Sequence, residues 1–475
     1  MDDYTILSED QSQFDDINKK FEEALADGAH RAETKNEANE FWAYMQECER
    51  YVLNGSLQTG TFHHDMENAL VLYHLNNLID QGHLTQLLRT HFDLPAAQVR
   101  SEMIPEEWNY AGWVVGDGTI YAASRYCQLD YRWTLVMVFY YYYKLRPEKK
   151  HPFVPAAMKV LNDPVLEKAR IAIIGDWGTG IWKDGKKQKC PAELVIQGVL
   201  DLDPDYIIHL GDVYYAGTPK EERKHLLDLL PSKYKNKVYT MNSNHEMYDG
   251  ANGLLGTTLQ NTLFEQQGGS SYFSLEIGDW VLVGLDSAYY DDSYLYMSGS
   301  LCNEEGGQQQ LDYLTKAGQG DKKVMLMTHH NGILVDKDGP ATNTTLWSQV
   351  QKALDGGLPD VWYWGHVHNA IIYRDDLSLY KNSKTGTALT SIMRCCGHAS
   401  IPFGNGDYLK HASAGSNPDV LFYATTPMPD PTDEVQKLRV INGFAMIEIN
   451  GSDFSETFYE VSNENPKPKQ VWPAS

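Results

Sequence analysis

The residues with the clearest chemical potential are polar side chains that directly follow short apolar segments. Asp176 follows the segment 171–174, and Asp212 follows the segment 207–210, each after a glycine. The pattern recurs further along the chain: Asn244 and His245 follow 238–241, His329 and His330 follow 324–328, and His366 and His368 follow 361–364. Such segments are typical of buried parallel strands, whose carboxyl ends meet at one edge of a sheet. We therefore expect these side chains to lie close together.

Carboxylate, amide and imidazole groups gathered at one sheet edge are suited to binding metal ions. This mixture of oxygen and nitrogen ligands favours borderline metals such as iron, zinc or manganese. A single aspartate can bridge two ions about 3.5 to 4 Å apart. The sequence therefore predicts a site for two cations that share one carboxylate.

The order of the motifs and the residues in them resemble those of the calcineurin-like metallophosphoesterases, and among them the purple acid phosphatases. The shared motifs are Asp-x-Gly at 176–178, Gly-Asp-x-x-Tyr at 211–215, Asn-His-Glu at 244–246, His at 329 and Gly-His-x-His at 365–368. Gly178 stands where many relatives carry a metal-binding histidine, and Tyr215 is present instead, which favours the purple acid phosphatase branch. Ser243 departs from the family pattern, which has a glycine before Asn-His. The resemblance covers about residues 168–460.

The resemblance implies a ligand set with Asp212 as the bridge. Asp176, Tyr215 and His368 complete the first implied metal site, and Asn244, His329 and His366 complete the second. The implied ions are Fe³⁺, bound by a tyrosine phenolate, and a partner that is Fe²⁺, Zn²⁺ or Mn²⁺. His329 is preferred to His330 because the family's ligand follows its strand immediately. His330 then supports the site or contacts the substrate.

The implied reaction is hydrolysis of a phosphoester by a metal-bound hydroxide. His245 is the residue expected to give the leaving group its proton. A phosphomonoesterase is the leading hypothesis, with a small-molecule phosphoester as substrate. A phosphodiesterase acting on cyclic nucleotides or nucleotide-linked diesters would use the same metals. A non-catalytic scaffold subunit is the alternative from another class, and such a protein would be expected to have lost some of the ligands.

The catalytic region, residues 166–475, is predicted to be an α/β domain. Helices are expected at 191–200, 219–230, 304–317 and 343–354, and further strands at 271–276, 280–286, 444–449 and 454–459. Strands and helices that alternate in this way suit two packed sheets with helices outside. The family resemblance implies the same arrangement, a four-layer α/β/β/α metallophosphoesterase sandwich.

Residues 1–165 have a different pattern and are predicted to form a mainly helical N-terminal domain. Apolar residues recur at helical spacing over 41–52, and a second helical stretch is expected over 65–92. Tyrosines are dense toward residue 143. A role as a cap or as an oligomerisation domain, which would make the protein a homo-oligomer, is our hypothesis for this region.

The composition indicates which classes of partner and which cellular compartment to expect. The chain of 475 residues has 64 acidic and 40 basic residues, giving a formal charge of -24. This charge opposes binding to nucleic acid or to anionic membranes. The most apolar run, 134–143, is too short to span a bilayer, and no secretory signal is visible after Met1. With only 6 cysteines in a long chain, a cytoplasmic location is expected.

Overall fold

The protein is described here from a computed structural model. The structure describes residues 14–16, 18–20, 115–116, 119–120, 126, 133–156, 166–182, 189–335, 340–401, 417–424 and 440–473. The chain divides into two compact units, residues 1–150 with 431–437 and residues 151–430 with 438–475. The division thus comes earlier in the chain than the predicted boundary near residue 165. The helices predicted over 41–52 and 65–92 lie outside the described residues.

In the first unit, the longest described element is helix α5, Thr134–Leu145, which contains the tyrosine-rich run. Residues 136–143 are all buried, as expected for a helix that is apolar on every face. Neighbouring tyrosines pack edge to face, with ring centroids of Tyr140 and Tyr141 5.2 Å apart. The remaining described elements are β1 (Val115–Gly116), its antiparallel partner β2 (Thr119–Ile120) and the helical turn η4 (Pro147–Lys149). Among the described residues, no helix is long and apolar enough to cross a membrane.

The second unit contains a six-stranded sheet with the order β17-β16-β15-β3-β4-β5. Strands β3, β4 and β5 are parallel, and β15 runs antiparallel to β3. The hairpin of β15 and β16 closes through a turn that contains Asn450 and Gly451. The strands are β3 (Lys168–Ile174), β4 (Tyr206–His209), β5 (Val238–Thr240), β15 (Gly443–Asn450), β16 (Asp453–Glu460) and β17 (Lys469–Trp472).

A seven-stranded sheet has the order β14-β12-β13-β11-β8-β7-β6. Its central strands β7, β8, β11 and β13 are parallel. A hairpin turn at 278–279 joins β6 to β7. The strands are β6 (Phe273–Ile277), β7 (Trp280–Gly284), β8 (Lys323–Thr328), β11 (Val361–Trp364), β12 (Ala370–Tyr373), β13 (Ile392–Cys396) and β14 (Val420–Tyr423).

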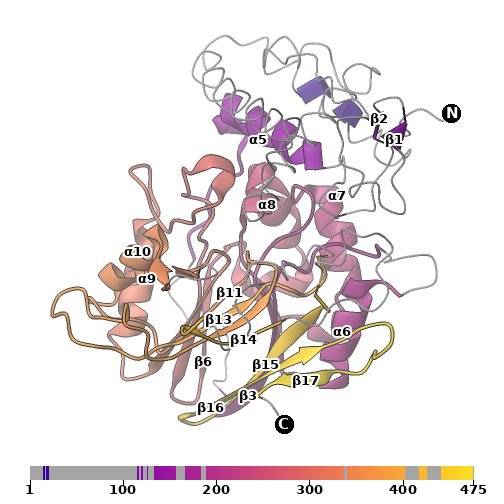
Figure 1. Cartoon of the computed structure of the whole chain (residues 1–475). Helices are drawn as coiled ribbons and strands as arrows, with labels where there is room; N and C mark the ends of the chain where they lie inside the picture. Colours follow the sequence, from indigo (N-terminus) through magenta and orange to yellow (C-terminus); the bar gives the residue numbers. More distant parts are fainter. Residues whose placement is uncertain are drawn as a thin grey trace. The chain divides into compact units, whose positions relative to one another are not determined.

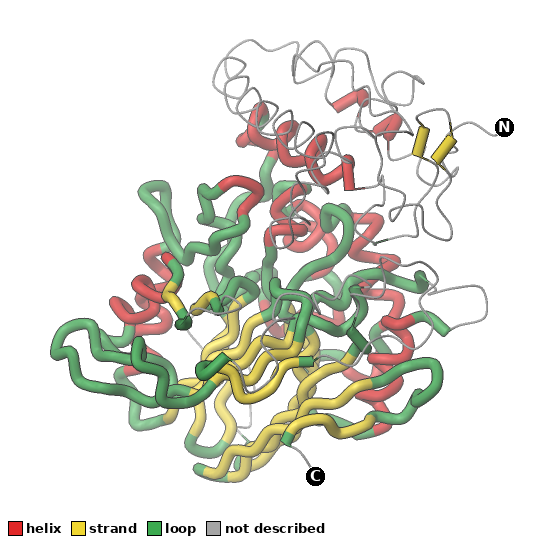
Figure 2. Tube along the Cα trace, viewed as in Figure 1, coloured by secondary structure: helices red, strands yellow, loops and turns green. Residues whose placement is uncertain are grey.

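The two sheets pack face to face around a shared apolar core, which includes Ile171 and Ile208 of one sheet and Met325 and Tyr363 of the other. Helices α9 and α10 cover the outer face of the seven-stranded sheet. Helix α6 packs against β15 of the six-stranded sheet, and Figures 1 and 2 show helices outside both sheets. The predicted α/β/β/α sandwich is therefore confirmed. The longer helices are α6 (Pro191–Asp201), α9 (Gln308–Gly318) and α10 (Thr345–Ala353).

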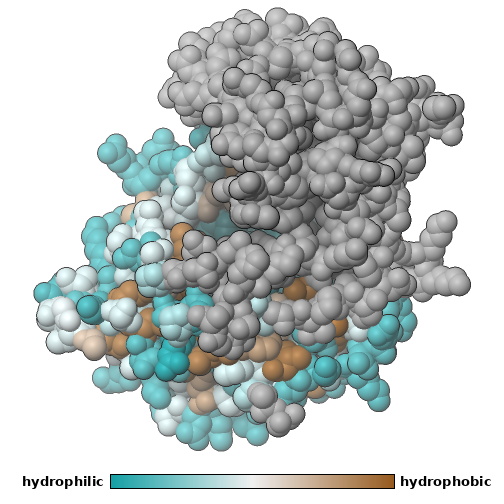
Figure 3. All heavy atoms as spheres, viewed as in Figure 1, coloured by the Kyte–Doolittle hydropathy of each residue, from teal (hydrophilic) through white to brown (hydrophobic). Residues whose placement is uncertain are grey.

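Short elements fill the connections near the carboxyl ends of the strands. The helix predicted over 219–230 is present as consecutive helical turns rather than as one regular helix. On the face seen in Figure 3, the described surface is mostly hydrophilic with smaller hydrophobic patches. The short elements are α7 (Pro219–Glu221), η5 (Glu222–Leu226), η6 (Leu227–Leu229), η7 (Ser232–Tyr234), α8 (Asn244–Tyr248), η8 (Leu254–Thr258), η9 (Thr262–Gln267), η10 (Tyr294–Tyr296), β9 (Ile333–Leu334) and β10 (Thr342–Asn343).

Candidate metal centre

The predicted ligands lie just beyond the strand ends, where the backbone turns sharply. Asp176 after β3, Asp212 after β4 and His366 after β11 have φ values of 57°, 75° and 63°. Asp and His are among the residues that adopt this left-handed region most readily. Gly365 allows the close approach, because a Cβ on it would lie 2.6 Å from Asp176 Oδ2. The turns therefore bring side chains from both sheets to one place.

One group of ligand atoms surrounds the imidazole of His329. Its Nε2 lies 2.8 Å from Asn244 Oδ1, 3.2 Å from His366 Nδ1 and 3.3 Å from Asp212 Oδ1. The other ring nitrogen, Nδ1, lies 2.9 Å from the carbonyl of Leu210. Since a carbonyl only accepts hydrogen bonds, Nδ1 carries the proton and Nε2 presents its lone pair to the cluster. This is the tautomer that a metal ligand needs.

A second group of ligand atoms lies on the other side of Asp212. His368 Nε2 is 3.4 Å from Asp176 Oδ1. The hydroxyl of Tyr214 lies 2.9 Å from Asp212 Oδ2, 3.3 Å from Asp176 Oδ1 and 3.2 Å from His368 Nε2. One ligand atom each from Asp176, Asp212 and His368 can be chosen so that all lie within 4.8 Å of one another. Asp212 thus has one oxygen toward each group.

The tyrosine at this position differs from the sequence prediction. Tyr215 was predicted as the ligand, but the hydroxyl that reaches the carboxylates belongs to Tyr214. Tyr215 contributes through its backbone instead, because its N–H donates to Glu221 and its carbonyl accepts from His245. The structure therefore brings the Tyr214 hydroxyl, and not the predicted Tyr215 hydroxyl, into hydrogen-bonding distance of Asp176 and Asp212.

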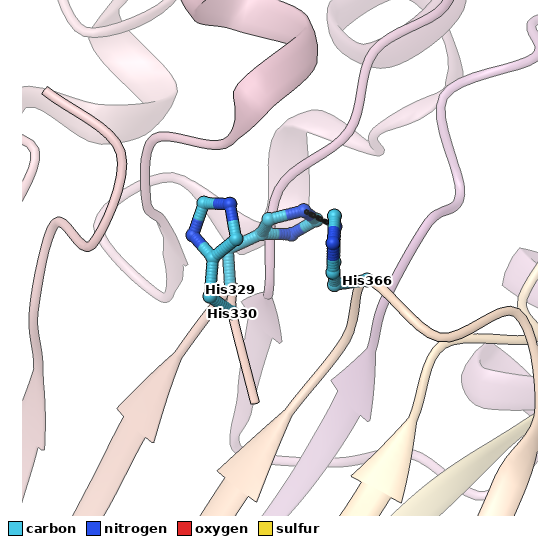
Figure 4. Close-up of side chains that lie close together, drawn as sticks. All are labelled: His329, His330 and His366. Atoms are coloured by element: carbon cyan, nitrogen blue, oxygen red, sulfur yellow. Dashed lines mark hydrogen bonds between the residues drawn. The ribbon is translucent and has the colours of Figure 1, made fainter. Parts of the chain in front are cut away.

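His330 lies beside the cluster, and both of its ring nitrogens have other partners. Figure 4 shows its ring next to those of His329 and His366. Its Nε2 lies 2.7 Å from the carbonyl of Tyr296, and its Nδ1 lies 2.9 Å from Ser287 Oγ. Nε2–H donates to the carbonyl, and Nδ1 accepts from the serine hydroxyl. Ligand atoms of His329, His330 and His366 can be chosen within 4.8 Å of one another, and of these three imidazoles His330 has both ring nitrogens engaged by Tyr296 and Ser287.

His245, the predicted proton donor, lies at the edge of the cluster. Its Nδ1 is 2.6 Å from the carbonyl of Tyr215, so this nitrogen carries a proton. Its Nε2 is 4.0 Å from Asp212 Oδ2. Its ring packs edge to face against Tyr214, with centroids 4.4 Å apart. The atom that faces the bridging carboxylate is therefore Nε2.

Ser243 and Glu246 contact Asp212 and the backbone that follows it. The Ser243 hydroxyl contacts Asp212 Oδ1 and Glu246 Oε2, and it accepts from the N–H of His245 at 3.0 Å. Glu246 Oε1 accepts from the N–H of Val213 at 2.9 Å. Burial, together with the charge of Asp212, raises the pKa of Glu246 to about 8. Glu246 therefore braces the turn that carries Asp212.

The electrostatics of the cluster suit cations. Burial lowers the pKa of His329 well below its ordinary value and that of His366 to about 3, so both imidazoles are neutral at neutral pH. Burial and the nearby charge of Asp212 raise the pKa of Asp176. Buried carboxylates beside neutral imidazoles form a site that metal ions can neutralise.

Arg394 and His398, which follow the same sheet edge, do not extend the site toward a phosphate. Arg394 is buried and forms ion pairs with Glu456 at 2.7 Å and with Asp375 at 3.3 Å. His398 is buried, and neither ring nitrogen has a hydrogen-bond partner among the residues that the structure describes. Neither side chain touches the predicted ligands in any described contact.

Comparisons with known proteins identify the family of this region. Residues 169–370 match the family model of calcineurin-like phosphoesterases. No curated protein sequence matches the chain. The chain is similar to the solved structure of a purple acid phosphatase from yellow lupin (Lupinus luteus) seeds, with 14% identity, 66% of this chain and 54% of that chain covered, and a TM-score of 0.41.

Two other solved structures have similar sequence identities and TM-scores. GAP50, the anchor in the inner membrane complex of Plasmodium, has 13% identity, with 64% of this chain and 88% of that chain covered and a TM-score of 0.38. A dimetal phosphatase from Danio rerio has 13% identity, with 65% and 99% covered and a TM-score of 0.34. The chain spans about half the length of the lupin protein, 54%. The match places residues 169–370 in the family that the sequence predicted, the calcineurin-like phosphoesterases.

Proposed function

Because residues 169–370 form a calcineurin-like phosphoesterase domain, we propose that the protein is a binuclear metal-dependent phosphomonoesterase. The observation that carries this proposal is the position of Asp212. One of its oxygens lies 3.3 Å from His329 Nε2, and the other lies 2.9 Å from the Tyr214 hydroxyl. A carboxylate placed in this way can bridge two cations.

The proposed ligand set follows the two groups of atoms. Tyr214 takes the place of Tyr215, and His330 stays outside the set because both of its ring nitrogens are engaged. The proposed ligands are Asp176, Asp212, Tyr214 and His368 for the first ion and Asp212, Asn244, His329 and His366 for the second.

The donor types suggest which ions fit. Burial and the carboxylates raise the pKa of the Tyr214 phenol well above its ordinary value, so only a strongly charged cation would favour the phenolate there. We propose Fe³⁺ beside Tyr214, as the resemblance to purple acid phosphatases implies, with Fe²⁺, Zn²⁺ or Mn²⁺ at the amide and imidazole ligands. When bound, the ions would neutralise phosphate oxygens and supply a hydroxide near neutral pH.

The side chains of this chain would perform the proton transfer. His245 holds a proton at Nδ1 through the Tyr215 carbonyl, so the proton given to a leaving alkoxide would come from Nε2 of the imidazolium. His330 fixes the segment beyond β7 by donating to Tyr296. Glu246 and Ser243 hold the Asp212 turn in place.

Two other functions remain in competition with this proposal. A phosphodiesterase would use the same ligands, and the preference for monoesters rests on the resemblance to purple acid phosphatases. A scaffold protein is less well supported, because the proposed ligands lie close together with a suitable tautomer at His329. Turnover by the metal-loaded protein of p-nitrophenyl phosphate and of bis(p-nitrophenyl) phosphate separates the three. Faster turnover of the monoester supports the proposal, faster turnover of the diester favours the phosphodiesterase, and no turnover of either favours the scaffold.

Location and partners are also proposals. Cys190, Cys302, Cys395 and Cys396 are free thiols among the described residues. We retain the hypothesis of a cytoplasmic location, which rests on the few cysteines in a long chain. We retain the hypotheses that a small phosphoester is the substrate, that nucleic acid is not a partner and that the N-terminal region mediates a homo-oligomer.

A further inference from the structure

Hydrogen bonds hold a segment between β7 and α9 beside the proposed metal centre. His330, which follows the ligand His329, lies 2.7 Å from the carbonyl of Tyr296 through its Nε2. The carboxylate of Asp291 accepts from the N–H groups of Ser298 and Gly299 at 3.1 and 2.8 Å. The segment therefore has a fixed conformation at the point where it meets the cluster.

This segment presents Met297 to the ligand Asn244. The sulfur of Met297 lies 3.6 Å from Asn244 Nδ2 and 3.9 Å from the Tyr248 hydroxyl. Asn244 Oδ1 points the opposite way, to His329 Nε2. The amide of Asn244 thus contacts His329 of the cluster through its oxygen and the Met297 thioether through its nitrogen.

Met297 is also open to solvent. It is 46% exposed, and Tyr294, in the same turn, is 47% exposed, although both are large apolar side chains. Asn244 itself is buried. A flexible thioether beside a reactive centre is suited to contact with an apolar or aromatic group, which would remove this surface from water.

The charge of the segment restricts what can lie there. Residues 287–303 include Asp291 and Asp292 and contain neither lysine nor arginine. A leaving group that carries further phosphates or carboxylates would find no counter-charge in this segment and would be repelled by the aspartates. An uncharged leaving group would not be.

We propose that Met297 and Tyr294 form the subsite for the leaving group and that the substrate is a phosphomonoester of an uncharged aryl or apolar alkyl alcohol. This inference rests on the proposed function, since the subsite is defined by its position beside Asn244. The phosphoryl group would be recognised by the metal centre and the alcohol by the thioether and the tyrosine ring.

The test compares two substrates that share a phosphoryl group and differ in the alcohol. KM and kcat are measured for phenyl phosphate and glycerol 2-phosphate with the metal-loaded full chain, its Met297→Ala and Met297→Leu variants and, as a control, Leu421→Ala. Leu421 is another exposed apolar residue, on the edge strand β14. Metal content and thermal melting are recorded for each protein, so that variants with a damaged site are recognised.

Met297→Ala is expected to raise the KM for phenyl phosphate about fivefold. The truncated side chain would cover less of the bound phenyl group, a loss that corresponds to roughly half of a methionine side chain. The kcat for phenyl phosphate, and both constants for glycerol 2-phosphate, should stay within about twofold. Met297→Leu should restore most of the loss, and Leu421→Ala should change nothing. Equal changes for both substrates, or no change for either, would overturn the subsite while leaving the phosphatase in place. No hydrolysis of either substrate by the wild-type protein would instead overturn the proposed function, and the subsite with it.

Discussion

The hydroxyl of Tyr214 lies 2.9 Å from Asp212 Oδ2, while the neighbouring Tyr215 makes its described contacts through the backbone. This predicts that only one of the two tyrosines can form an iron phenolate. In the iron-loaded protein, Tyr214→Phe should abolish a broad visible absorption band, and Tyr215→Phe should keep it. The matched pair is compared by its visible spectrum at equal iron content. If the band disappeared in Tyr215→Phe and persisted in Tyr214→Phe, the proposed ligand assignment would be wrong.

Ser243 stands where the family pattern has glycine, and its hydroxyl contacts both Asp212 and Glu246. Ser243→Ala should weaken metal binding about tenfold, because the bridging carboxylate loses a fixed hydrogen bond worth roughly 1–3 kcal/mol. The measurement is a metal titration of the metal-free protein. Ser271→Ala is the control, since the buried Ser271 hydroxyl donates in the same way to Asp286, which is not a ligand. Equal loss of affinity in both variants would contradict a specific role for Ser243.

His245 should affect the rate without affecting the metal. His245→Ala is expected to retain its metal content and to lose about 10²–10³-fold in kcat on an alkyl phosphate, which needs a proton on its leaving oxygen. The loss on p-nitrophenyl phosphate should be much smaller, because nitrophenolate leaves without protonation. The two substrates are compared at saturating concentration. A metal-replete variant with unchanged turnover of alkyl phosphates would exclude the proton-donor role.

Acid should destabilise the fold through His398. Burial lowers its pKa from about 6.5 to about 3. Because the unfolded chain binds this proton more tightly, the contribution to stability is complete above pH 6.5 and is lost as the pH falls toward 3. Denaturant unfolding at pH 7.5 and 5 measures the effect. His398→Leu should lose less stability between these two values than the wild-type protein, by roughly 1–2 kcal/mol. An unchanged difference would show that another group controls this pH range.

Sequence patterns predicted the architecture, and they also predicted that the candidate ligands would lie together, since each follows an apolar strand and parallel strands end at a common edge. They could not choose between Tyr214 and Tyr215, which are adjacent and identical in type. Only the path of the chain after Asp212 decides which hydroxyl reaches the carboxylates. A repeated tyrosine in this motif was the one signal that the assignment was open.

Contacts between distant segments were also beyond the reach of sequence. The sequence does not show, for example, that Arg394 of one sheet forms an ion pair with Glu456 of the other. Met297 carries no motif, and its position depends on the anchoring of its segment by His330. The helices predicted over 41–52 and 65–92 lie outside the described residues, so they remain predictions.

The most direct test of the central claim is the metal content of the purified protein and of its Asp212→Ala variant, measured together with turnover of a phosphomonoester. We expect about two ions per chain in the wild-type protein, because Asp212 serves both sites. Asp212→Ala should lose both ions and essentially all turnover. A wild-type protein that binds no metal after reconstitution, or a variant that keeps both ions and its activity, would contradict the binuclear hydrolase.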